Sequence, residues 1–448
     1  MLCISLTPAV LEDVFNSDLR LADCVEVRLD HLNNPEQSLN VSWKRLNLPV
    51  IITCPRVENG GLFKGTAEEE RRLLERAVDN GAAFVDMDYR DARPIASAQV
   101  IGSYHNFVET PDDIQRHLEV ACDNPAIQIG KIATTVRSWA DNRRLLEVLD
   151  RPWPKPVTVV GMGEMGQIIR VIGKARGSYV TYATTGQLNA SELIHGYRYR
   201  RIQRTTKLFG VVGNPVTHSR GYLLHNRAFE ATGANFAYLK FPVDDVRDFF
   251  EHARAIGIAG FSVTMPHKTA VIPYLSDMTQ AAREVGAVNT VFDKGGRWLG
   301  DNTDVHGAQV ALASIDFDPA GKRVVILGTG GASKAAAVAV KTASSLVVLP
   351  RAQVTNGGDY VCDLLINATP VGMTPNVDAS PVAGTIRADV VFDMVYTPAR
   401  TRLLKLAEEQ GKRVIPGTTM FYAQAARQFE IWTGQPPLPG LYPPENTT

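Results

Sequence analysis

The chain has 448 residues, enough for two or three domains, and its 45% hydrophobic and 21% charged residues are typical of a globular protein. Its formal net charge is zero, which argues against nucleic acid or an anionic membrane as the main partner. No apolar run is long enough for a membrane-spanning helix. The first residues, M-L-C-I-S-L-T-P, lack the basic start of a signal peptide and form too short a run for one. We therefore interpret them as a first strand.

Residues 1 to 204 alternate short apolar runs with amphipathic helical patterns, as expected for eight strand–helix units. This alternation predicts an α/β fold, a small (β/α)8 TIM barrel, with a doubly wound open sheet as the alternative. Thr110 and Pro111 read as the cap and first position of a helix. The expected strands are Leu2–Leu6, Cys24–Arg28, Val50–Thr53, Phe84–Asp88, Val100–Tyr104, Ile127–Ala133, Val157–Gly161 and Tyr179–Ala183, and the expected helices include Ala67–Asn80, Pro111–Cys122, Ser138–Leu149 and Glu164–Ala175.

In such a barrel, chemistry takes place where strands end and loops begin. Lys131 lies inside an apolar run, where desolvation would lower the pKa of its amine and make it nucleophilic toward a carbonyl. His105 follows the fifth expected strand, and the ordinary pKa of a histidine suits proton transfer near neutrality. The alternatives are that Lys131 extends to solvent from the barrel rim and that His105 is a structural turn residue. The polar residues at the strand ends are Glu26, Arg28, Arg56, Glu58, His105, Lys131, Arg170 and Gln187.

With these polar residues in their motifs, residues 1–203 resemble the type I 3-dehydroquinate dehydratase family. The matching motifs are E-V-R-L-D, S-Y-H-N-F-V-E-T-P, K-I-A, M-G-E-M-G-x-x-x-R and T-G-Q. The resemblance implies that Lys131 forms an imine with the substrate ketone, that His105 removes a proton from the adjacent carbon, and that Arg170 binds the substrate carboxylate. The further substrate-binding residues that it implies are Glu26, Arg28, Arg56 and Gln187.

The chain departs from this family at two places. The family has T-x-R and a glutamate directly before two glycines, whereas this chain reads T-C-P-R-V-E-N-G-G. Arg56 and Glu58 are therefore displaced and Asn59 stands where the acid would align, with a one-residue slip of the loop that restores both as the alternative. The family's S-A-P-G-Q is A-T-T-G-Q, so Ala183 replaces a substrate-facing serine, and Thr184 or Thr185 is a possible substitute. We expect weaker binding or lower activity from these changes, and not a complete loss.

A basic segment, Tyr197–Lys207, separates the two halves, and we expect domains at residues 1–204, 207–315 and 316–448. Between Phe261 and Gly307, polar clusters end the expected strands Phe261–Val263 and Ala287–Phe292, and such ends build small-molecule sites in α/β sheets. Their amine, carboxylate, amide and hydroxyl groups suit a polyhydroxylated ligand and a proton relay, with three solvated turns as the alternative. The clusters contain Thr264, Lys268, Asn289, Asn302 and Asp304.

The run V-V-I-L-G-T-G-G-A-S-K predicts a strand, a glycine loop and a helix at Ala332–Thr342. This arrangement presents backbone amides and a helix N-terminus to a pyrophosphate, as in a Rossmann domain. The next expected strand, Leu346–Leu349, is followed by Arg351 and not by an acid, which favours NADP over NAD. The predicted cofactor-binding residues of this region are Gly328, Gly330, Gly331, Ala332 and Arg351.

Residues from about Leu208 to Leu441 resemble the shikimate dehydrogenase family. The matching motifs are G-N-P-V-x-H-S, V-T-M-P-H-K, A-V-N-T, G-D-N-T-D, G-T-G-G-A-S, I-N-A-T-P-V-G-M, D-M-V-Y and Q-A-A-x-x-F. The resemblance implies that Lys268 and Asp304 are the catalytic pair at the reacting hydroxyl. It also implies that Ser219, Thr264, Asn289, Tyr396 and Gln424 hold the substrate, and that Asn367, Thr369, Met394 and Gly417 lie along NADP.

Two departures occur in this half. The family's S-K-S-P is S-R-G-Y, so Gly221 lacks a hydroxyl where a substrate carboxylate is expected to bind. The segment Ala352–Asp363 is short, and we expect a helix to be lost or truncated there.

The two families that the halves of the chain resemble catalyse successive reactions, so the sequence predicts a bifunctional shikimate-pathway enzyme. It would dehydrate 3-dehydroquinate to 3-dehydroshikimate and reduce that product to shikimate with NADPH. The alternatives are a shikimate dehydrogenase with an impaired dehydratase domain and a non-catalytic sensor of quinate or shikimate. We expect small-molecule substrates, no nucleic acid, no membrane, no metal and a monomer or homodimer. Five scattered cysteines without a C-x-x-C motif predict a reducing, cytoplasmic location.

Overall fold

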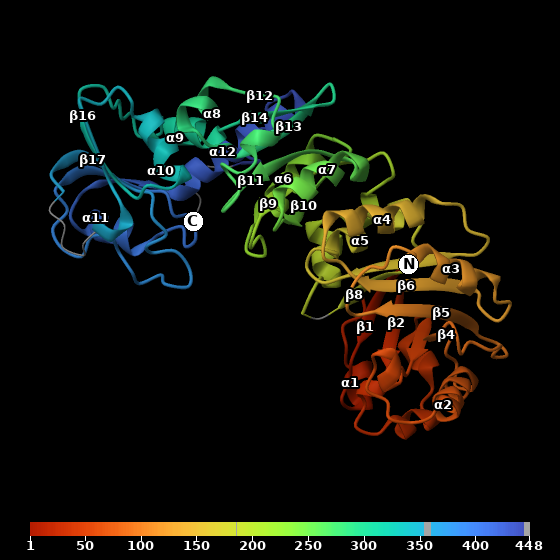
Figure 1. Cartoon of the computed structure of the whole chain (residues 1–448). Coiled ribbons are helices and arrows are strands. Elements are labelled where there is room, and N and C mark those ends of the chain that lie inside the picture. Colours follow the sequence, from red (N-terminus) through yellow and green to blue (C-terminus); the bar gives the residue numbers. More distant parts are fainter. Residues whose placement is uncertain (185, 354–359, 443–448) are drawn as a thin grey trace. The chain divides into compact units, whose positions relative to one another are not determined.

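The computed structural model describes residues 1–184, 186–353 and 360–442. The chain divides into two compact units. Figure 1 shows the whole chain, coloured along the sequence from red at the N-terminus to blue at the C-terminus. The first unit combines Met1–Leu208 with Asn235–Ile258, and the second combines Phe209–Ala234 with Ala259–Thr448. Within the described ranges, no helix is both long enough and apolar enough to cross a membrane.

The first unit contains a parallel eight-stranded sheet in the order β7-β6-β5-β4-β3-β2-β1-β8. Val157 bridges Ser178, and the backbone N–H of Tyr179 donates to Val157 O at 2.8 Å, which closes the sheet into the predicted barrel. The open-sheet alternative is therefore wrong. The strands are β1 (Leu2–Leu6), β2 (Cys24–Arg28), β3 (Val50–Thr53), β4 (Phe84–Asp88), β5 (Gln99–Asn106), β6 (Ile129–Thr135), β7 (Val157–Met162) and β8 (Thr181–Thr184).

The barrel strands are buried on both faces, which explains their nearly continuous apolar runs. One set of side chains fills the interior, and the alternate set packs under the surrounding helices, because successive side chains of a strand point to opposite faces. The interior set forms a cluster that includes Cys3, Cys24, Ile51, Ile101, Ile129, Val160 and Tyr182. The alternate set packs with helix residues in a second cluster, which includes Val25, Val27, Ile52, Val85, Leu73 and Leu74.

Not every connection in the barrel contains an α-helix. Strands β2 and β3 are joined through short 3-10 helices, and residues 89–98, which include Pro94, join β4 to β5 without a helix. After β8 the chain forms only a short π-helix, Glu192–Gly196, and a 3-10 helix, Tyr199–Arg201. The expectation of eight regular strand–helix units is therefore wrong at these three places. Between β4 and β5, the proline and the short connection do not support a helix. The α-helices of the barrel are α1 (Leu11–Phe15), α2 (Ala67–Asp79), α3 (Ile114–Asp123), α4 (Trp139–Asp150) and α5 (Gln167–Ile172).

The predicted cap at Thr110 is also wrong. Helix α3 begins at Ile114, and its N-cap residue, Asp113, makes no side-chain cap bond. The Thr110 hydroxyl lies 2.9 Å from that of Thr134 and donates to the carbonyl of Thr135 at 3.0 Å. Thr110 is buried, and a buried hydroxyl requires a partner, so its contacts on β6 replace the helix cap.

Residues beyond the barrel sequence belong to the first unit through helix α7 (Val246–Ile256) and strand β10 (Phe236–Pro242). Trp139, at the start of α4, donates from Nε1 to Pro242 O at 3.1 Å and lies edge-on to the ring of Phe249, with ring centroids 4.9 Å apart. Asp248 accepts from the backbone N–H groups of Trp139 at 2.5 Å and Ala140 at 3.2 Å. These are first-turn donors of α4, so Asp248 stabilises that helix from a distant part of the chain.

A mixed sheet in the order β10-β9-β11-β13-β14-β12 follows the barrel sequence. Strand β13 runs antiparallel to both β11 and β14. The remaining strands of this sheet are β9 (Lys207–Gly213), β11 (Ile258–Val263), β12 (Asp277–Met278), β13 (Thr290–Lys294) and β14 (Arg297–Asp301). The helices that follow its strands along the chain include α6 (Gly221–Ala231), α8 (Gln280–Val285) and α9 (Thr303–Ala313).

The last third forms a parallel sheet in the order β16-β15-β17-β18-β19, the arrangement expected of a Rossmann domain. The segment with the expected missing helix includes residues 354–359, which lie outside the described residues. The strands are β15 (Arg323–Leu327), β16 (Ser345–Leu349), β17 (Cys362–Asn367), β18 (Ala388–Asp393) and β19 (Arg413–Pro416), and the helices are α10 (Gly331–Ala339), α11 (Arg402–Glu409) and α12 (Gly417–Thr433).

Candidate active sites

Lys131 lies in the interior of the barrel, on β6, and is only 6% exposed. Its Nζ donates to Asp86 Oδ2, from β4, at 2.5 Å, and lies 3.8 Å from Glu26 Oε1, from β2. Asp86 is absent from the predicted site residues. Its only signal in the sequence is a carboxylate within the apolar run F-V-D-M-D. The structure thus joins a predicted amine and a predicted acid, and it adds an acid that the sequence pattern did not identify.

The charge state of Lys131 differs from the prediction. Burial alone would lower the pKa of its amine, as expected, but the negative charges of Asp86 and Glu26 outweigh burial, and the pKa is raised. The expectation of an amine activated by desolvation is therefore wrong for the resting protein. The alternative that Lys131 extends to solvent from the rim is also wrong, since the residue is buried.

His105 lies within β5 and not after it, because this strand extends to Asn106. Its ring is parallel to that of Phe107, with centroids 5.9 Å apart. Desolvation and the positive charge of Lys131 lower the pKa of His105 to about 4, so the ordinary pKa assumed from the sequence is wrong. The imidazole is therefore neutral at physiological pH, which is the form that accepts a proton.

Arg170 lies on α5, within the helix expected at Glu164–Ala175 after the seventh strand, and is buried. Its Nη1 donates to Thr184 Oγ1 at 3.4 Å, and its Nε has no hydrogen-bond partner in the described part of the chain. Burial lowers the pKa of Arg170 to about 10. A buried guanidinium with an unused donor is suited to bind an anionic ligand group.

The other predicted residues of the barrel site differ in their surroundings. Arg28 makes two hydrogen bonds to Asp30, at 3.0 and 2.6 Å. Gln187 follows β8 and is exposed. The side-chain oxygen Oδ1 of Asn59, where the family has an acid, accepts a hydrogen bond from Arg90 at 3.4 Å. Thr185, one of the two threonines expected to substitute for a serine, lies outside the described residues.

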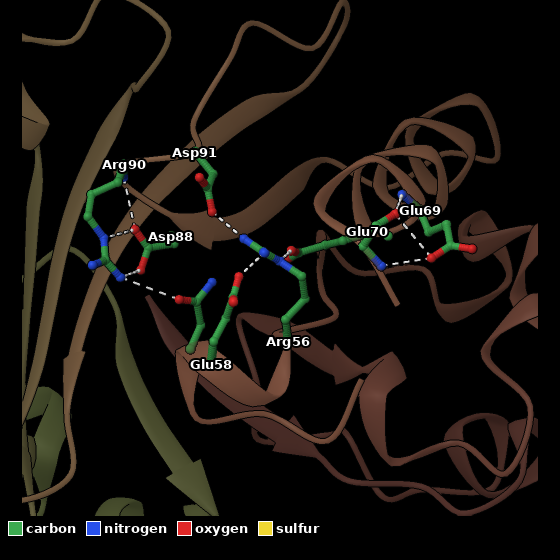
Figure 2. Close-up of polar contacts among 9 residues, drawn as sticks. Arg56, Glu58, Glu69, Glu70, Asp88, Arg90 and Asp91 are labelled. Carbon is green, nitrogen blue, oxygen red and sulfur yellow. Dashed lines mark hydrogen bonds and ion pairs between the residues drawn. The ribbon is translucent and has the colours of Figure 1, made fainter. Parts of the chain in front are cut away.

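Arg56 is surrounded by acidic side chains, as Figure 2 shows. Its Nε donates to Glu70 Oε2 at 2.7 Å, and its other nitrogens pair with Glu58 and Asp91. Burial raises the pKa of Glu70, and the charge of Arg56 opposes this shift. Because three carboxylates already occupy the guanidinium, its substrate-binding role stays a prediction.

In the second unit, Lys268 Nζ donates to Asp304 Oδ2 at 2.6 Å. Asn289 lies within the expected strand Ala287–Phe292, but β13 begins only at Thr290, so Asn289 directly precedes this strand. The clusters still meet, because β13 is antiparallel to β11 and β14, and its start lies at the edge where those two strands end.

Asn289 connects this edge to helices α9 and α12 through a buried hydrogen-bond network. Its Oδ1 accepts from the Thr303 backbone N–H at 2.8 Å, and its Nδ2 donates to Thr303 Oγ1 at 3.0 Å. The Thr303 hydroxyl is 3.3 Å from Gln424 Oε1, and Gln428 Nε2 donates to Thr290 Oγ1 at 2.9 Å. Thr303 and Gln428 were not predicted, although Thr303 stands inside the motif G-D-N-T-D.

The remaining predicted substrate residues lie around this network. The backbone N–H of Thr264 donates to Val212 O at 2.9 Å, which attaches the end of β11 to β9. Tyr396 stacks on Phe421 of α12, with ring centroids 4.5 Å apart. Ser219 lies in the loop between β9 and α6, and among the described residues no hydrogen bond joins it to Lys268 or Asp304.

The glycine loop follows β15 and leads into α10, as predicted. Gly328 has φ +113°, which favours glycine, and the buried Ser333 hydroxyl donates to its carbonyl at 2.6 Å. A Cβ on Gly330 would have no atom within 4 Å, whereas one on Gly331 would lie 3.2 Å from Lys268 Cδ. The loop is therefore open at Gly330 and lies beside the Lys268–Asp304 pair, which fits a dinucleotide with its reactive end at that pair.

The other predicted cofactor residues lie at or just after the ends of β16, β17, β18 and β19. Asn367 is turned inward: its Nδ2 donates to Asp393 Oδ1 at 2.9 Å, and its Oδ1 accepts from the Thr369 hydroxyl at 2.6 Å. Burial raises the pKa of Asp393 to about 6. A Cβ on Gly417 would lie 2.4 Å from Val395 O and 2.7 Å from Met394 O, so only glycine fits there. Arg351 is exposed in a short 3-10 helix after β16.

Three family models match the chain. They describe type I 3-dehydroquinase over residues 2–204, the shikimate dehydrogenase substrate binding domain over residues 211–291, and the shikimate 5'-dehydrogenase C-terminal domain over residues 417–439.

Individual relatives agree with these models. An Arabidopsis thaliana protein named bifunctional 3-dehydroquinate dehydratase/shikimate dehydrogenase, chloroplastic, is 33% identical over 479 residues, covering 94% of this chain and 79% of the relative. A shikimate dehydrogenase (NADP(+)) of Thermococcus kodakarensis is 40% identical over 259 residues, covering 53% of this chain and 94% of the relative. A crystal structure of a shikimate dehydrogenase in complex with NADP+ is 34% identical and covers 54% of this chain and 94% of its own, with a TM-score of 0.50.

Proposed function

The chain belongs to the family of bifunctional 3-dehydroquinate dehydratases/shikimate dehydrogenases, and from this premise we propose how its two sites divide the chemistry. The barrel converts 3-dehydroquinate to 3-dehydroshikimate, and the second site reduces 3-dehydroshikimate to shikimate with NADPH. The product of the first reaction is the substrate of the second. The observation that carries the proposal is the presence in one chain of a buried Lys131 beside His105's strand and of a Lys268–Asp304 pair beside a glycine loop.

In the barrel, the Lys131 amine forms an imine with the substrate ketone. The positive charge of the protonated imine stabilises a negative charge that develops on the adjacent carbon. Neutral His105 accepts the proton from that carbon and then gives a proton to the departing hydroxyl, which leaves as water. Burial of the lysine between carboxylates supports the assignment, because those carboxylates stabilise a cationic imine at the same position.

The substrate-binding residues of the barrel are part of the same proposal. Arg170, with its unused buried donor, binds the substrate carboxylate. The ring hydroxyls are bound by the other residues of the barrel mouth, which are Glu26, Arg28, Arg56 and Gln187.

In the second site, Lys268 and Asp304 act at the carbonyl that is reduced. Lys268 donates a hydrogen bond and a proton to the carbonyl oxygen, and Asp304 orients the ammonium and shares its charge. NADPH, when bound, supplies the electron pair for the reduction. The substrate is held by Ser219, Thr264, Asn289, Tyr396 and Gln424, and the cofactor by Gly328, Gly330, Gly331, Ala332, Arg351, Asn367, Thr369, Met394 and Gly417.

The first experiment mixes the purified chain with 3-dehydroquinate and NADPH and follows the enone product and the nicotinamide absorbance together. We expect enone to form first and NADPH to be consumed afterwards. Lys131→Ala should abolish enone formation but still reduce added 3-dehydroshikimate, and Lys268→Ala should do the reverse. Loss of both activities in either single variant would contradict two independent sites.

Two negative outcomes point to the alternatives. A chain that reduces 3-dehydroshikimate but forms no enone would have a barrel impaired by the changes at Asn59 and Ala183. A chain that binds these ligands without converting either would be a sensor.

Location and assembly also belong to the proposal. All five cysteines lie in described residues and are free and buried, which supports a reducing compartment such as the cytoplasm. Cell fractionation with an antibody to the chain tests this location. Light scattering during size-exclusion chromatography distinguishes the expected monomer or homodimer from larger assemblies.

A further inference from the structure

The buried ammonium of Lys131 faces two carboxylates at unequal distances. Asp86 Oδ2 lies 2.5 Å from Nζ, whereas Glu26 Oε1 lies 3.8 Å from it. Only the shorter distance is that of a hydrogen bond. A proton on Nζ therefore has a direct path to Asp86, while transfer to Glu26 requires the side chains to move.

A second partner holds Asp86 in place for this contact. The Ser103 hydroxyl donates to Asp86 Oδ1 at 2.5 Å, and both residues are buried. Ser103 is also the register partner of Lys131 in the β5–β6 pair, so the three side chains come from neighbouring strands of one barrel. One oxygen of Asp86 is thus committed to the hydroxyl and the other to the amine.

Imine formation requires an amine that has lost its proton. Burial would lower the pKa of Lys131, but the charges of Asp86 and Glu26 raise it, so the resting side chain is an ammonium ion. A proton acceptor inside the barrel is therefore needed before the nitrogen can attack. In the proposed mechanism His105 serves the later transfer from carbon.

We propose that Asp86 is the proton acceptor that releases the Lys131 amine and that Ser103 is a positioning residue for Asp86. This inference rests on the dehydratase function proposed above and names a further residue for its first step. One proton moves from Nζ to Asp86 Oδ2, which leaves a neutral amine and a carboxylic acid. The nitrogen lone pair then forms a bond to the ketone carbon, the π electrons move to the ketone oxygen, and a second N–H proton passes to that oxygen.

The resulting carbinolamine is neutral, and Asp86 completes the step. Asp86 returns its proton to the carbinolamine hydroxyl, the C–O bond breaks, and water leaves. The nitrogen lone pair forms the C=N bond, which gives a protonated imine opposite the restored carboxylate. An ammonium ion and a ketone have become an iminium ion and water, so no external acid, base or oxidant is consumed.

The test measures imine formation directly in the full chain. Wild type and Asp86→Asn are mixed with 3-dehydroquinate, reduced with borohydride at short times between pH 6 and 9, and analysed by mass spectrometry for the adduct on Lys131. We expect Asp86→Asn to form the adduct about 100-fold more slowly near neutral pH. Its rate should rise with pH as solvent removes the proton, whereas the wild-type rate should be nearly constant.

A purely electrostatic role for Asp86 predicts the opposite result. The asparagine removes a charge that raises the pKa of Lys131, so a larger fraction of the amine would be unprotonated. If Asp86 did not accept the proton, the adduct would therefore form as fast as in the wild type or faster. That result would overturn the inference. Glu26→Gln removes one charge from the same cluster, and we expect it to keep the wild-type pH dependence. A pH dependence like that of Asp86→Asn would also overturn the inference.

Two further variants keep the test decisive if Asp86→Asn does not fold, which circular dichroism would reveal. Asp86→Glu retains a carboxylate and should recover the flat pH dependence, and Ser103→Ala should slow adduct formation several-fold with that dependence unchanged. A glutamate variant with steep pH dependence would contradict proton acceptance by Asp86. A wild-type chain that forms no adduct yet reduces 3-dehydroshikimate would remove the dehydratase function, and the inference with it.

Discussion

Single residues in the barrel acquire their chemistry from partners far away in the sequence. Lys131 and Asp86 are separated by 45 positions, yet their hydrogen bond helps to decide that the lysine carries a charge. His105 is affected in the other direction, since burial and the nearby Lys131 ammonium both disfavour a second positive charge. The two side chains therefore rest as an ammonium ion and a neutral imidazole.

The pH dependence of the dehydratase follows from the lowered pKa of His105. With a pKa of about 4, the imidazole stays unprotonated from neutral pH down to about pH 5, and the protonated form appears only below that range. We expect protonation of His105 to lower kcat/KM for 3-dehydroquinate only below about pH 5. Circular dichroism at each pH separates this effect from unfolding, and an acid limb centred near pH 6.5 would contradict the prediction.

Arg56 gives a prediction about stability. Arg56→Ala would leave the buried Glu70 without its cation, and loss of one partner of a buried pair typically costs about 3–5 kcal/mol. We expect a decrease of roughly 3 kcal/mol in the free energy of unfolding, measured by urea denaturation. Arg72→Ala, on the helix α2 that carries Glu70, is the matched control, because the pair of Arg72 with Glu36 is exposed and should contribute less than about 1 kcal/mol. Unchanged stability with a higher KM would instead favour substrate binding by Arg56.

At the scale of elements, strand direction decides which polar residues meet. Asn289 stands at the start of β13, where a parallel sheet would place it far from the ends of its neighbours. Antiparallel pairing with β11 and β14 returns it to the edge that carries Thr264 and Asp304. The glycine loop is positioned in a similar way, because β15 and α10 bring Gly331 beside Lys268.

The loop between β15 and α10 can be tested at Gly330. Its φ of −75° and ψ of −175° are open to any residue, and a Cβ would meet no atom within 4 Å. Gly330→Ala should therefore fold normally but place a methyl group in the space expected for the cofactor. We expect KM for NADPH to rise about tenfold, a loss of roughly 1.4 kcal/mol, with KM for 3-dehydroshikimate unchanged. Gly384→Ala, at another open position, is the control, and equal KM values for NADPH in both variants would contradict the prediction.

At the scale of the whole molecule, the barrel is not completed by its own stretch of sequence. Residues 235–258 belong to the first unit, where Asp248 accepts hydrogen bonds from the start of α4 and Phe249 packs on Trp139. Arg176 also donates to the carbonyl of Ile256 at 2.9 Å. Folding of the barrel is therefore coupled to a later part of the chain.

A chain truncated after Leu208 tests this coupling. It lacks the residues that cover Trp139, which is 0% exposed in the full chain, and burial of a large apolar side chain contributes about 1.5–3 kcal/mol. We expect a lower unfolding temperature for the barrel and red-shifted tryptophan fluorescence. Asp248→Ala in the full chain should show a smaller loss, about 1 kcal/mol, as for other helix caps. A truncated barrel as stable as the full chain would show that these contacts contribute little.

The sequence by itself determined the barrel strands, the glycine loop and most of the residues proposed for the two sites. Strands buried on both faces leave contiguous apolar runs, as at Val50–Thr53, and a nucleotide loop is a local feature that its glycines identify. Such features depend on neighbours in the chain, so a linear pattern is sufficient to find them.

Only the tertiary structure decided the partners and charge states of these residues. It placed Asp86 on Lys131, surrounded Arg56 with three carboxylates, and added residues 235–258 to the barrel unit. The thirteen-residue helix α2 shows the contrast, since its Thr66 capping box is readable locally while the role of its Glu70 depends on Arg56. Electrostatic energies depend on distance and burial in three dimensions, and these quantities are set by segments that the sequence places far apart.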